Sequence, residues 1–159
     1  AVKLNESTTE NFTIDELIKT LNLKINHNMP DKSLVIPLIQ VDRSLQIQGD
    51  INSLVQVLAN IIQNACESYQ DDYGSVDFIV QKEGKNIKFI VKDNGRGIPV
   101  EVKSRLFREM VTTKGKNGTG IGLYMSYSTI KGRFGGDIWF ESNGDNGTTF
   151  YITVPYVSD

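Results

Sequence analysis

The sequence predicts an α+β fold: a two-layer α/β sandwich in which a mixed, mainly antiparallel sheet carries its helices on one face. Three stretches place apolar residues at helical spacing, and others alternate apolar and polar residues in pairs joined by glycine-containing turns. The chain has 159 residues, a hydrophobic content of 39% and a formal net charge of -2, which is typical of one globular domain. We therefore expect one domain over residues 12–159, preceded over 1–11 by a tail or the remnant of an upstream segment.

The first helix is predicted to start after Thr13, because Thr13 and Glu16 have the spacing of a capping box. The asparagine, proline and aspartate of residues 28–31 end it. Two short β-branched stretches, over 34–39 and 45–47, predict strands. The apolar stripe of the helix comprises Leu17, Ile18, Leu21 and Ile25.

The strongest helical pattern begins after Gly49-Asp50. A hairpin is predicted next, with strands over 76–80 and 87–91 and a turn at 83–86. The apolar stripe of the central helix comprises Ile51, Leu54, Val55, Leu58, Ile61, Ile62, Ala65 and Tyr69.

Residues 99–118 show no sustained pattern, and we interpret them as a mobile segment. A third helix is predicted over 121–130, and the glycines within 132–136 end it. A second hairpin follows over 138–154, with its turn at 143–147.

The composition excludes several kinds of site. One cysteine, Cys66, cannot form an internal disulfide, and one histidine, His27, cannot supply a two-histidine metal site. The nearly balanced charge gives no basic footprint, so we expect no nucleic-acid partner. No apolar run approaches the roughly 20 residues of a membrane span. We therefore expect no direct membrane contact by this domain.

The central helix has a polar face on which Asn60 and Asn64 lie one turn apart. A carboxamide oxygen suits Mg²⁺, which takes few protein oxygens and completes its shell with water and phosphate. For the helix taken alone, a solvated face is the alternative interpretation. The neighbouring polar residues are Gln56, Gln63 and Glu67.

Asp93 continues the inward alternation of the strand over 87–91. A carboxylate at the mouth of an apolar core needs a donor, and the amino group of a ligand could supply it. Gly95 and Gly97 follow, and their missing Cβ atoms let the backbone approach a flat ring; a turn with positive φ is the alternative.

A second glycine cluster, residues 114–122, leads into the predicted third helix. Free N–H groups and the helix dipole favour phosphate there, and Lys114 and Lys116 reinforce this. The cluster is not a dinucleotide loop, which needs glycine in place of Leu123, nor a P-loop, which needs lysine in place of Ile121. A flexible linker is the alternative.

Taken in order, these motifs resemble the ATP-binding catalytic domain of sensor histidine kinases, whose Bergerat-type fold is shared with type II topoisomerases, Hsp90 chaperones and mismatch-repair ATPases. The resemblance runs from Phe12 to about Pro155. The matching segments are 58–65 (N box), 93–98 (G1 box), 106–114 (F box region), 118–123 (G2 box), and the closing 135–138 and 147–150.

The resemblance implies that the domain binds ATP and Mg²⁺, with Asn60 and Asn64 as catalytic residues and Asn64 as the Mg²⁺ ligand. It also implies that Asp93 accepts a hydrogen bond from the adenine amino group, and that residues 99–117 form a lid. The cofactor-binding residues implied are Asn60, Asn64, Asp93, Gly95, Gly97, Ile98, Thr113, Lys114, Gly115, Lys116, Gly118, Thr119, Gly120, Ile121, Gly122, Leu123 and Thr148.

The chain also departs from the family pattern. Glu67 stands where many of these kinases have a basic residue, Ser68 replaces a common aromatic, and residues 108–111 replace Glu-Pro-Phe-Phe. His27 lacks the acidic neighbour of the family's phosphorylated histidine, so we expect a structural or surface role for it. We expect Cys66 to be a core thiol.

The function implied is a protein histidine kinase of two-component signal transduction, which donates the γ-phosphate of ATP to a histidine on its own dimerisation domain, with a response regulator downstream. The resemblance further implies a cytoplasmic domain and a homodimeric parent, for which anchoring in the cell membrane stays open. Two alternatives of the same fold also stay open: a nucleotide-operated conformational switch and a stand-alone anti-sigma serine kinase.

Overall fold

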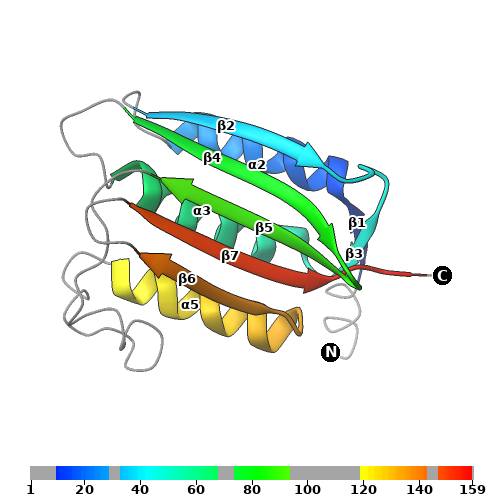
Figure 1. The fold of residues 1–159 in the computed structure, drawn as a ribbon. Coiled ribbons are helices and arrows are strands. Elements are labelled where there is room, and N and C mark those ends of the chain that lie inside the picture. The colour runs from blue at the N-terminus through cyan, green and yellow to red at the C-terminus, as the bar shows by residue number, and fades with distance from the viewer. Residues whose placement is uncertain (1–9, 29–32, 68–73, 94–118, 143–146, 159) are drawn as a thin grey trace.

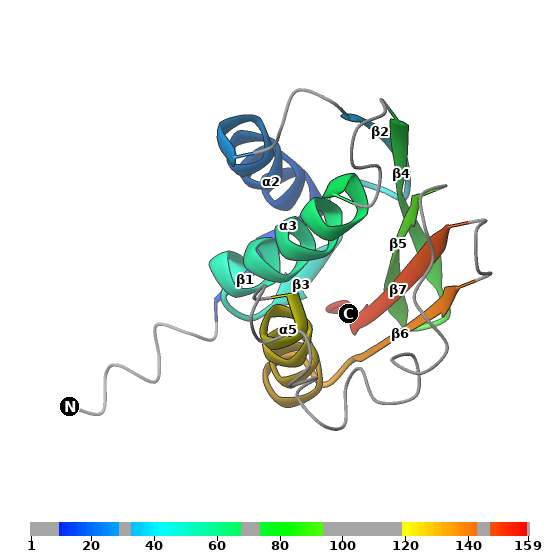
Figure 2. The same cartoon turned by 90° about the vertical axis from the view of Figure 1, so that its left-hand side faces the viewer.

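A computed structural model describes residues 10–28, 33–67, 74–93, 119–142 and 147–158 (Figure 1). The described helices lie side by side on one face of the main sheet, and none of them covers its other face, as Figure 2 shows edge-on. This arrangement confirms the predicted two-layer sandwich. The helices are α2 (Ile14–Asn28), α3 (Ile51–Glu67) and α5 (Thr119–Arg133).

Within the described ranges, five strands form the main sheet in the order β2-β4-β5-β7-β6. β2 runs parallel to β4, and every other neighbouring pair is antiparallel, so the sheet is mixed and mainly antiparallel as predicted. The strands are β2 (Ser33–Gln40), β4 (Gly74–Glu83), β5 (Asn86–Asp93), β6 (Asp137–Ser142) and β7 (Thr148–Pro155).

A small second sheet was not predicted from the sequence. It pairs β1 (Asn11–Thr13) antiparallel with β3 (Gln46–Gln48). Its central pair, Phe12 and Ile47, is buried at 4% and 0% exposure. The strand predicted over 45–47 corresponds to β3, whereas the three residues of β1 are too few to show an alternating pattern or a β-branched run.

The predicted capping box opens α2. The backbone N–H of Glu16 donates to Oγ1 of Thr13 at 3.0 Å, and the backbone N–H of Thr13 donates to Oε1 of Glu16 at 2.9 Å. Such a cap stabilises a helix by about 0.5–2 kcal/mol. The predicted apolar stripe behind it is buried in the core: Leu17, Ile18, Leu21 and Ile25.

The core fills the space between the helices and the inner face of the sheet. Phe89 of the central strand β5 is fully buried there, as are Leu58 and Ile61 of α3. The turn of the β4–β5 hairpin contains Gly84 at a φ of 60°, a conformation that favours glycine. The predicted hairpin is therefore confirmed together with its turn.

Four chain segments meet at one end of the domain, the left-hand end in Figure 1. α3 and β5 end there, while α5 and β7 begin there. Because these segments carry the polar residues singled out in the sequence, this end holds the candidate site. None of the helices in the described ranges could span a lipid bilayer.

Candidate functional site

Asp93 is the last residue of β5 and is only 4% exposed. Its side chain lies on the inner face, as the alternation of the strand predicted. The backbone N–H of Thr148, at the start of β7, donates to Oδ1 of Asp93 at 3.3 Å. From the sequence, the amino group of a ligand was one possible donor; in the structure, the neighbouring strand supplies a donor.

Thr148 extends this contact to the edge of the sheet. Its Oγ1 donates to Oγ of Ser142 at 3.3 Å, and both residues are buried, at 7% and 8% exposure. Ser142 and Thr148 are paired residues of β6 and β7. Ser142, Thr148 and Asp93 therefore form a buried polar row across three strands. Sequence reasoning missed Ser142, since only the strand pairing brings it beside Thr148.

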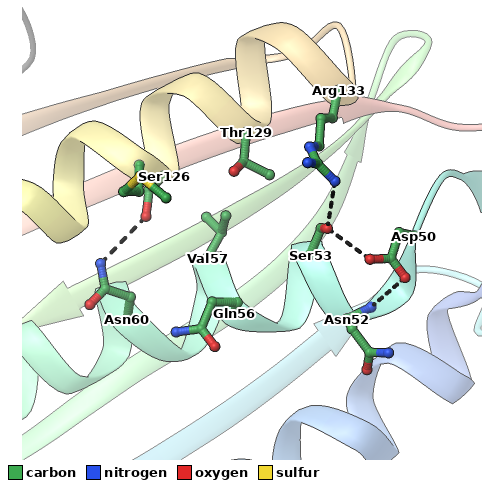
Figure 3. Close-up of a pocket in the computed structure, with 10 residues that line it drawn as sticks. Asp50, Asn52, Ser53, Gln56, Val57, Asn60, Ser126, Thr129 and Arg133 are labelled. Carbon is green, nitrogen blue, oxygen red and sulfur yellow. Dashed lines mark hydrogen bonds between the residues drawn. The ribbon is translucent and has the colours of Figure 1, made fainter. Parts of the chain in front are cut away.

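Asn60 is half-buried on the side of α3 that faces α5 (Figure 3). Its Nδ2 donates to Oγ of Ser126 at 3.4 Å, so a hydrogen bond links the two helices. Ser126 is 3% exposed and was not among the predicted site residues. The signal that could have revealed it is a hydroxyl within the apolar stripe of the third helix, between Leu123 and Ile130.

Asn64 lies one turn after Asn60 and is also half-buried. Its Nδ2 is buried and has no hydrogen-bond partner among the described residues. A buried donor without a partner costs about 1–3 kcal/mol, so an oxygen atom of a ligand beside it would be favourable. Because the two ends of a carboxamide have nearly the same shape, rotation about χ2 would instead offer the oxygen to a cation.

A groove of about 530 Å³ runs between α3 and α5 (Figure 3). Asn60 and Ser126 lie at one end of it. At the other end, Oγ of Ser53 donates to Oδ2 of Asp50 at 2.8 Å and accepts from Nη1 of Arg133 at 3.5 Å. The volume is in the range of small-ligand sites, and the lining is rich in hydrogen-bonding groups. Asp93 is not part of this lining.

No cluster of three or more His, Cys, Asp or Glu side chains that could hold a metal ion occurs in the ranges the structure covers. A Mg²⁺ ion at the carboxamides of Asn60 and Asn64 would therefore depend on oxygens from water and a ligand. Mg²⁺ commonly binds in this way in nucleotide sites. The carboxamide oxygens of Asn60 and Asn64 therefore suit Mg²⁺, provided that water and a ligand complete its coordination shell.

The glycine-rich segments are only partly covered by the structure. Thr119, Gly120, Ile121 and Gly122 form the first turn of α5, as the phosphate hypothesis requires. Leu123 follows with its side chain buried in the core, at 3% exposure. The other predicted residues of the two glycine clusters and of the lid lie outside the described residues: Gly95, Gly97, Ile98, Thr113, Lys114, Gly115, Lys116 and Gly118.

Two further expectations concern the single cysteine and the single histidine. Cys66 is 4% exposed and belongs to the hydrophobic core, which confirms the expected core thiol. His27 lies in the last turn of α2, and its side chain lies outside the described residues, as does that of Glu67. Their expected roles stay predictions.

Known proteins are similar to this chain in sequence. A family model described as "Histidine kinase-, DNA gyrase B-, and HSP90-like ATPase" matches residues 49–158. Sporulation kinase A of Bacillus subtilis (strain 168) is 41% identical over 112 residues, which cover 70% of this chain and 18% of that protein. The chain therefore spans less than a fifth of the length of this relative.

Solved structures give the same picture. The nucleotide-free catalytic domain of histidine kinase ThkA has a TM-score of 0.77 at 27% identity, covering 92% of this chain and 95% of that one. A structure of ThkA in complex with the response regulator protein TrrA has a TM-score of 0.73 at 25% identity, covering 92% of this chain and 41% of that one.

Proposed function

Because this chain belongs to the histidine kinase-, DNA gyrase B- and HSP90-like ATPases, we propose that it binds ATP with Mg²⁺ and donates the γ-phosphate to a histidine on a separate dimerisation domain. The observation that carries this proposal is the convergence of α3, α5, β5 and β7 at one end of the domain (Figure 1). Asp93 ends β5 and the turn over 119–122 begins α5 at this end, where α3, which carries Asn60 and Asn64, also ends.

The adenine would be recognised by Asp93. An ionised carboxylate accepts about four hydrogen bonds, so it can accept from both the N–H of Thr148 and an amino group. Thr148 in turn holds the carboxylate in one orientation from the neighbouring strand. A buried acceptor at this position favours adenine over guanine, because the O6 atom of guanine is itself an acceptor.

The phosphates would lie between α3 and the N-terminus of α5. The first turn of α5, over 119–122, supplies backbone N–H groups and the positive end of the helix dipole. The buried Nδ2 of Asn64 can donate to a phosphate oxygen, or its carboxamide can turn its oxygen toward Mg²⁺. When bound, Mg²⁺ neutralises phosphate charge in such sites.

Asn60 favours phosphoryl transfer over hydrolysis. In the related ATPases that act as conformational switches, this position of the helix carries a glutamate that activates water. The carboxamide of Asn60 cannot take a proton from water, and its Nδ2 is bonded to Ser126. Bound ATP should therefore persist until a histidine nucleophile arrives.

The proposed partners follow from the proposed chemistry. A domain that donates phosphate to histidine requires a dimerisation domain that bears this histidine, and we propose that the parent protein supplies it and is a homodimer. By similarity to ThkA, which has been solved with the response regulator TrrA, a response regulator would receive the phosphate next. We place the domain in the cytoplasm, where ATP is available.

Label transfer tests this function. The chain is incubated with γ-labelled ATP and Mg²⁺, alone and with the dimerisation domain of its parent, and the control is that domain with its histidine replaced by alanine. We expect acid-labile label on the intact dimerisation domain only. Label on serine instead would support the anti-sigma kinase alternative, and rapid release of inorganic phosphate without transfer would support the switch.

A further inference from the structure

We propose that Ser126 is a positioning residue: its hydroxyl orients the carboxamide of Asn60 so that the amide oxygen is presented to a Mg²⁺-bound nucleotide. This inference rests on the proposed function and adds a residue that the motif comparison did not include. Its starting point is the 3.4 Å hydrogen bond from Nδ2 of Asn60 to Oγ of Ser126, which joins α3 to α5 (Figure 3).

The burial of Ser126 indicates a specific role for its hydroxyl. The residue is 3% exposed, between Leu123 at 3% and Ile130 at 0% on the inward face of α5. The helical spacing would place an aliphatic side chain at this position, and burying a hydroxyl there without a partner is unfavourable. The carboxamide of Asn60 is the partner that offsets this cost.

In the structure, the donor end of the Asn60 carboxamide faces Ser126. An asparagine side chain has a donor end and an acceptor end, and rotation about χ2 exchanges them. While Nδ2 of Asn60 donates to Ser126, the oxygen lies on the side of the carboxamide away from Ser126, as Figure 3 shows. Mg²⁺ binds oxygen and not an amide nitrogen, and this orientation leaves the amide oxygen available to the ion.

Ser126 also ties this orientation to the phosphate-binding end of α5. It lies one helical turn after Gly122, in the same helix whose first turn would contact the phosphates. A shift of α5 would therefore move the phosphate donors and the partner of Asn60 together. The residues that would bind Mg²⁺ and the N–H groups that would bind the phosphates would then change position together.

The test uses the full chain with Ser126→Ala and, as a matched control, Ser128→Ala. Ser128 lies in the same helix, but its side chain is exposed. The dissociation constant of ATP is measured by calorimetry with Mg²⁺ and with EDTA. The constant with EDTA divided by the constant with Mg²⁺ gives the factor by which the metal strengthens ATP binding. We expect Ser126→Ala to lower this ratio by about fivefold, equivalent to roughly 1 kcal/mol.

Under EDTA, ATP affinity should change less than about twofold in Ser126→Ala, the size of a change at a site without direct ligand contact. Ser128→Ala should match the wild type in both conditions, and Ser126→Thr, which keeps the hydroxyl, should retain most of the ratio. Equal losses with Mg²⁺ and with EDTA would show a structural role only and overturn the inference.

A ligand-free measurement separates this inference from the proposed function. In the NMR spectrum without nucleotide, Ser126→Ala should shift the side-chain NH₂ signals of Asn60, while Ser128→Ala should leave them in place. If the wild-type chain binds no ATP while Ser126→Ala still shifts the Asn60 signals, the proposed function is contradicted, and with it the metal role of Ser126. Normal ATP binding with no shift would contradict the inference alone.

Discussion

The backbone N–H of Thr148 donates a 3.3 Å hydrogen bond to Oδ1 of Asp93, so the start of β7 holds a carboxylate at the end of β5. Both residues are buried, at 7% and 4% exposure. A hydrogen-bond acceptor is thereby kept in one orientation at the mouth of the apolar core. A single substitution, of Asp93 by asparagine, can therefore test this part of the candidate site.

Asp93→Asn should weaken ATP binding by about 1–3 kcal/mol, because the new NH₂ group would face either the N–H of Thr148 or the adenine amino group. The control is Asp77→Asn, the same change on β4 at a residue that alternates with the buried Val76 and Phe78. Calorimetry with ATP and GTP measures both variants. Unchanged ATP affinity in Asp93→Asn would remove this residue from the site.

The isolated chain should hydrolyse ATP slowly, because Asn60 cannot act as a general base and its Nδ2 is bonded to Ser126. We expect a steady-state rate well below about 1 per second, a low value for an enzyme. Release of inorganic phosphate from the chain with Mg²⁺-ATP measures it. A rate at or above this value would favour the conformational switch over the kinase.

Gly49→Ala should destabilise the domain far more than Gly84→Ala. Both glycines have positive φ, 143° and 60°, but a Cβ at Gly49 would lie 2.6 Å from Cε1 of Phe134, while nothing lies within 4 Å at Gly84. The ring of Phe134 is 7% exposed and has little room to move.

We expect a loss of about 1 kcal/mol for Gly84→Ala from backbone strain, and about 2–4 kcal/mol for Gly49→Ala from strain and overpacking together. Urea unfolding of the two variants measures the difference. Equal losses in the free energy of unfolding would mean that the Phe134 ring moves aside without destabilising the domain.

The stability of the domain at acid pH should depend in part on Asp15. Its carboxylate accepts hydrogen bonds from Lys19 at 3.0 Å and from Arg43 at 3.2 Å, which lower its pKa in the folded state. Because the folded pKa lies below the unfolded one, this stabilisation is present above the ordinary aspartate pKa of about 3.9 and is lost as the pH falls through the folded pKa.

Asp15→Asn should therefore lower the melting temperature slightly at neutral pH and leave it unchanged at strongly acid pH, where the wild-type carboxyl is protonated. Thermal unfolding of both chains across this range provides the comparison. A difference of the same size at every pH would contradict the role of the charge.

The sequence alone determined the elements whose signals are local. The capping box of Thr13 and Glu16, the turn with Gly84 and the apolar stripes depend on residues a few positions apart, so periodicity and turn chemistry were sufficient. The order of the motifs also identified the family, which the match over residues 49–158 confirms. Asp93 was correctly placed on the inner face because alternation along a strand decides which face a side chain takes.

Only the tertiary structure decided which polar groups meet. Asn60 and Ser126 are 66 residues apart, and Thr148 and Asp93 are 55 apart. The pairing of β1 with β3 and the parallel register of β2 on β4 likewise join distant segments. Such contacts depend on strand order and on how two helices pack together, and no local pattern encodes these. The motifs therefore predicted candidate site residues, whereas helix packing and strand pairing supplied the hydrogen-bond partners of Asn60 and Asp93.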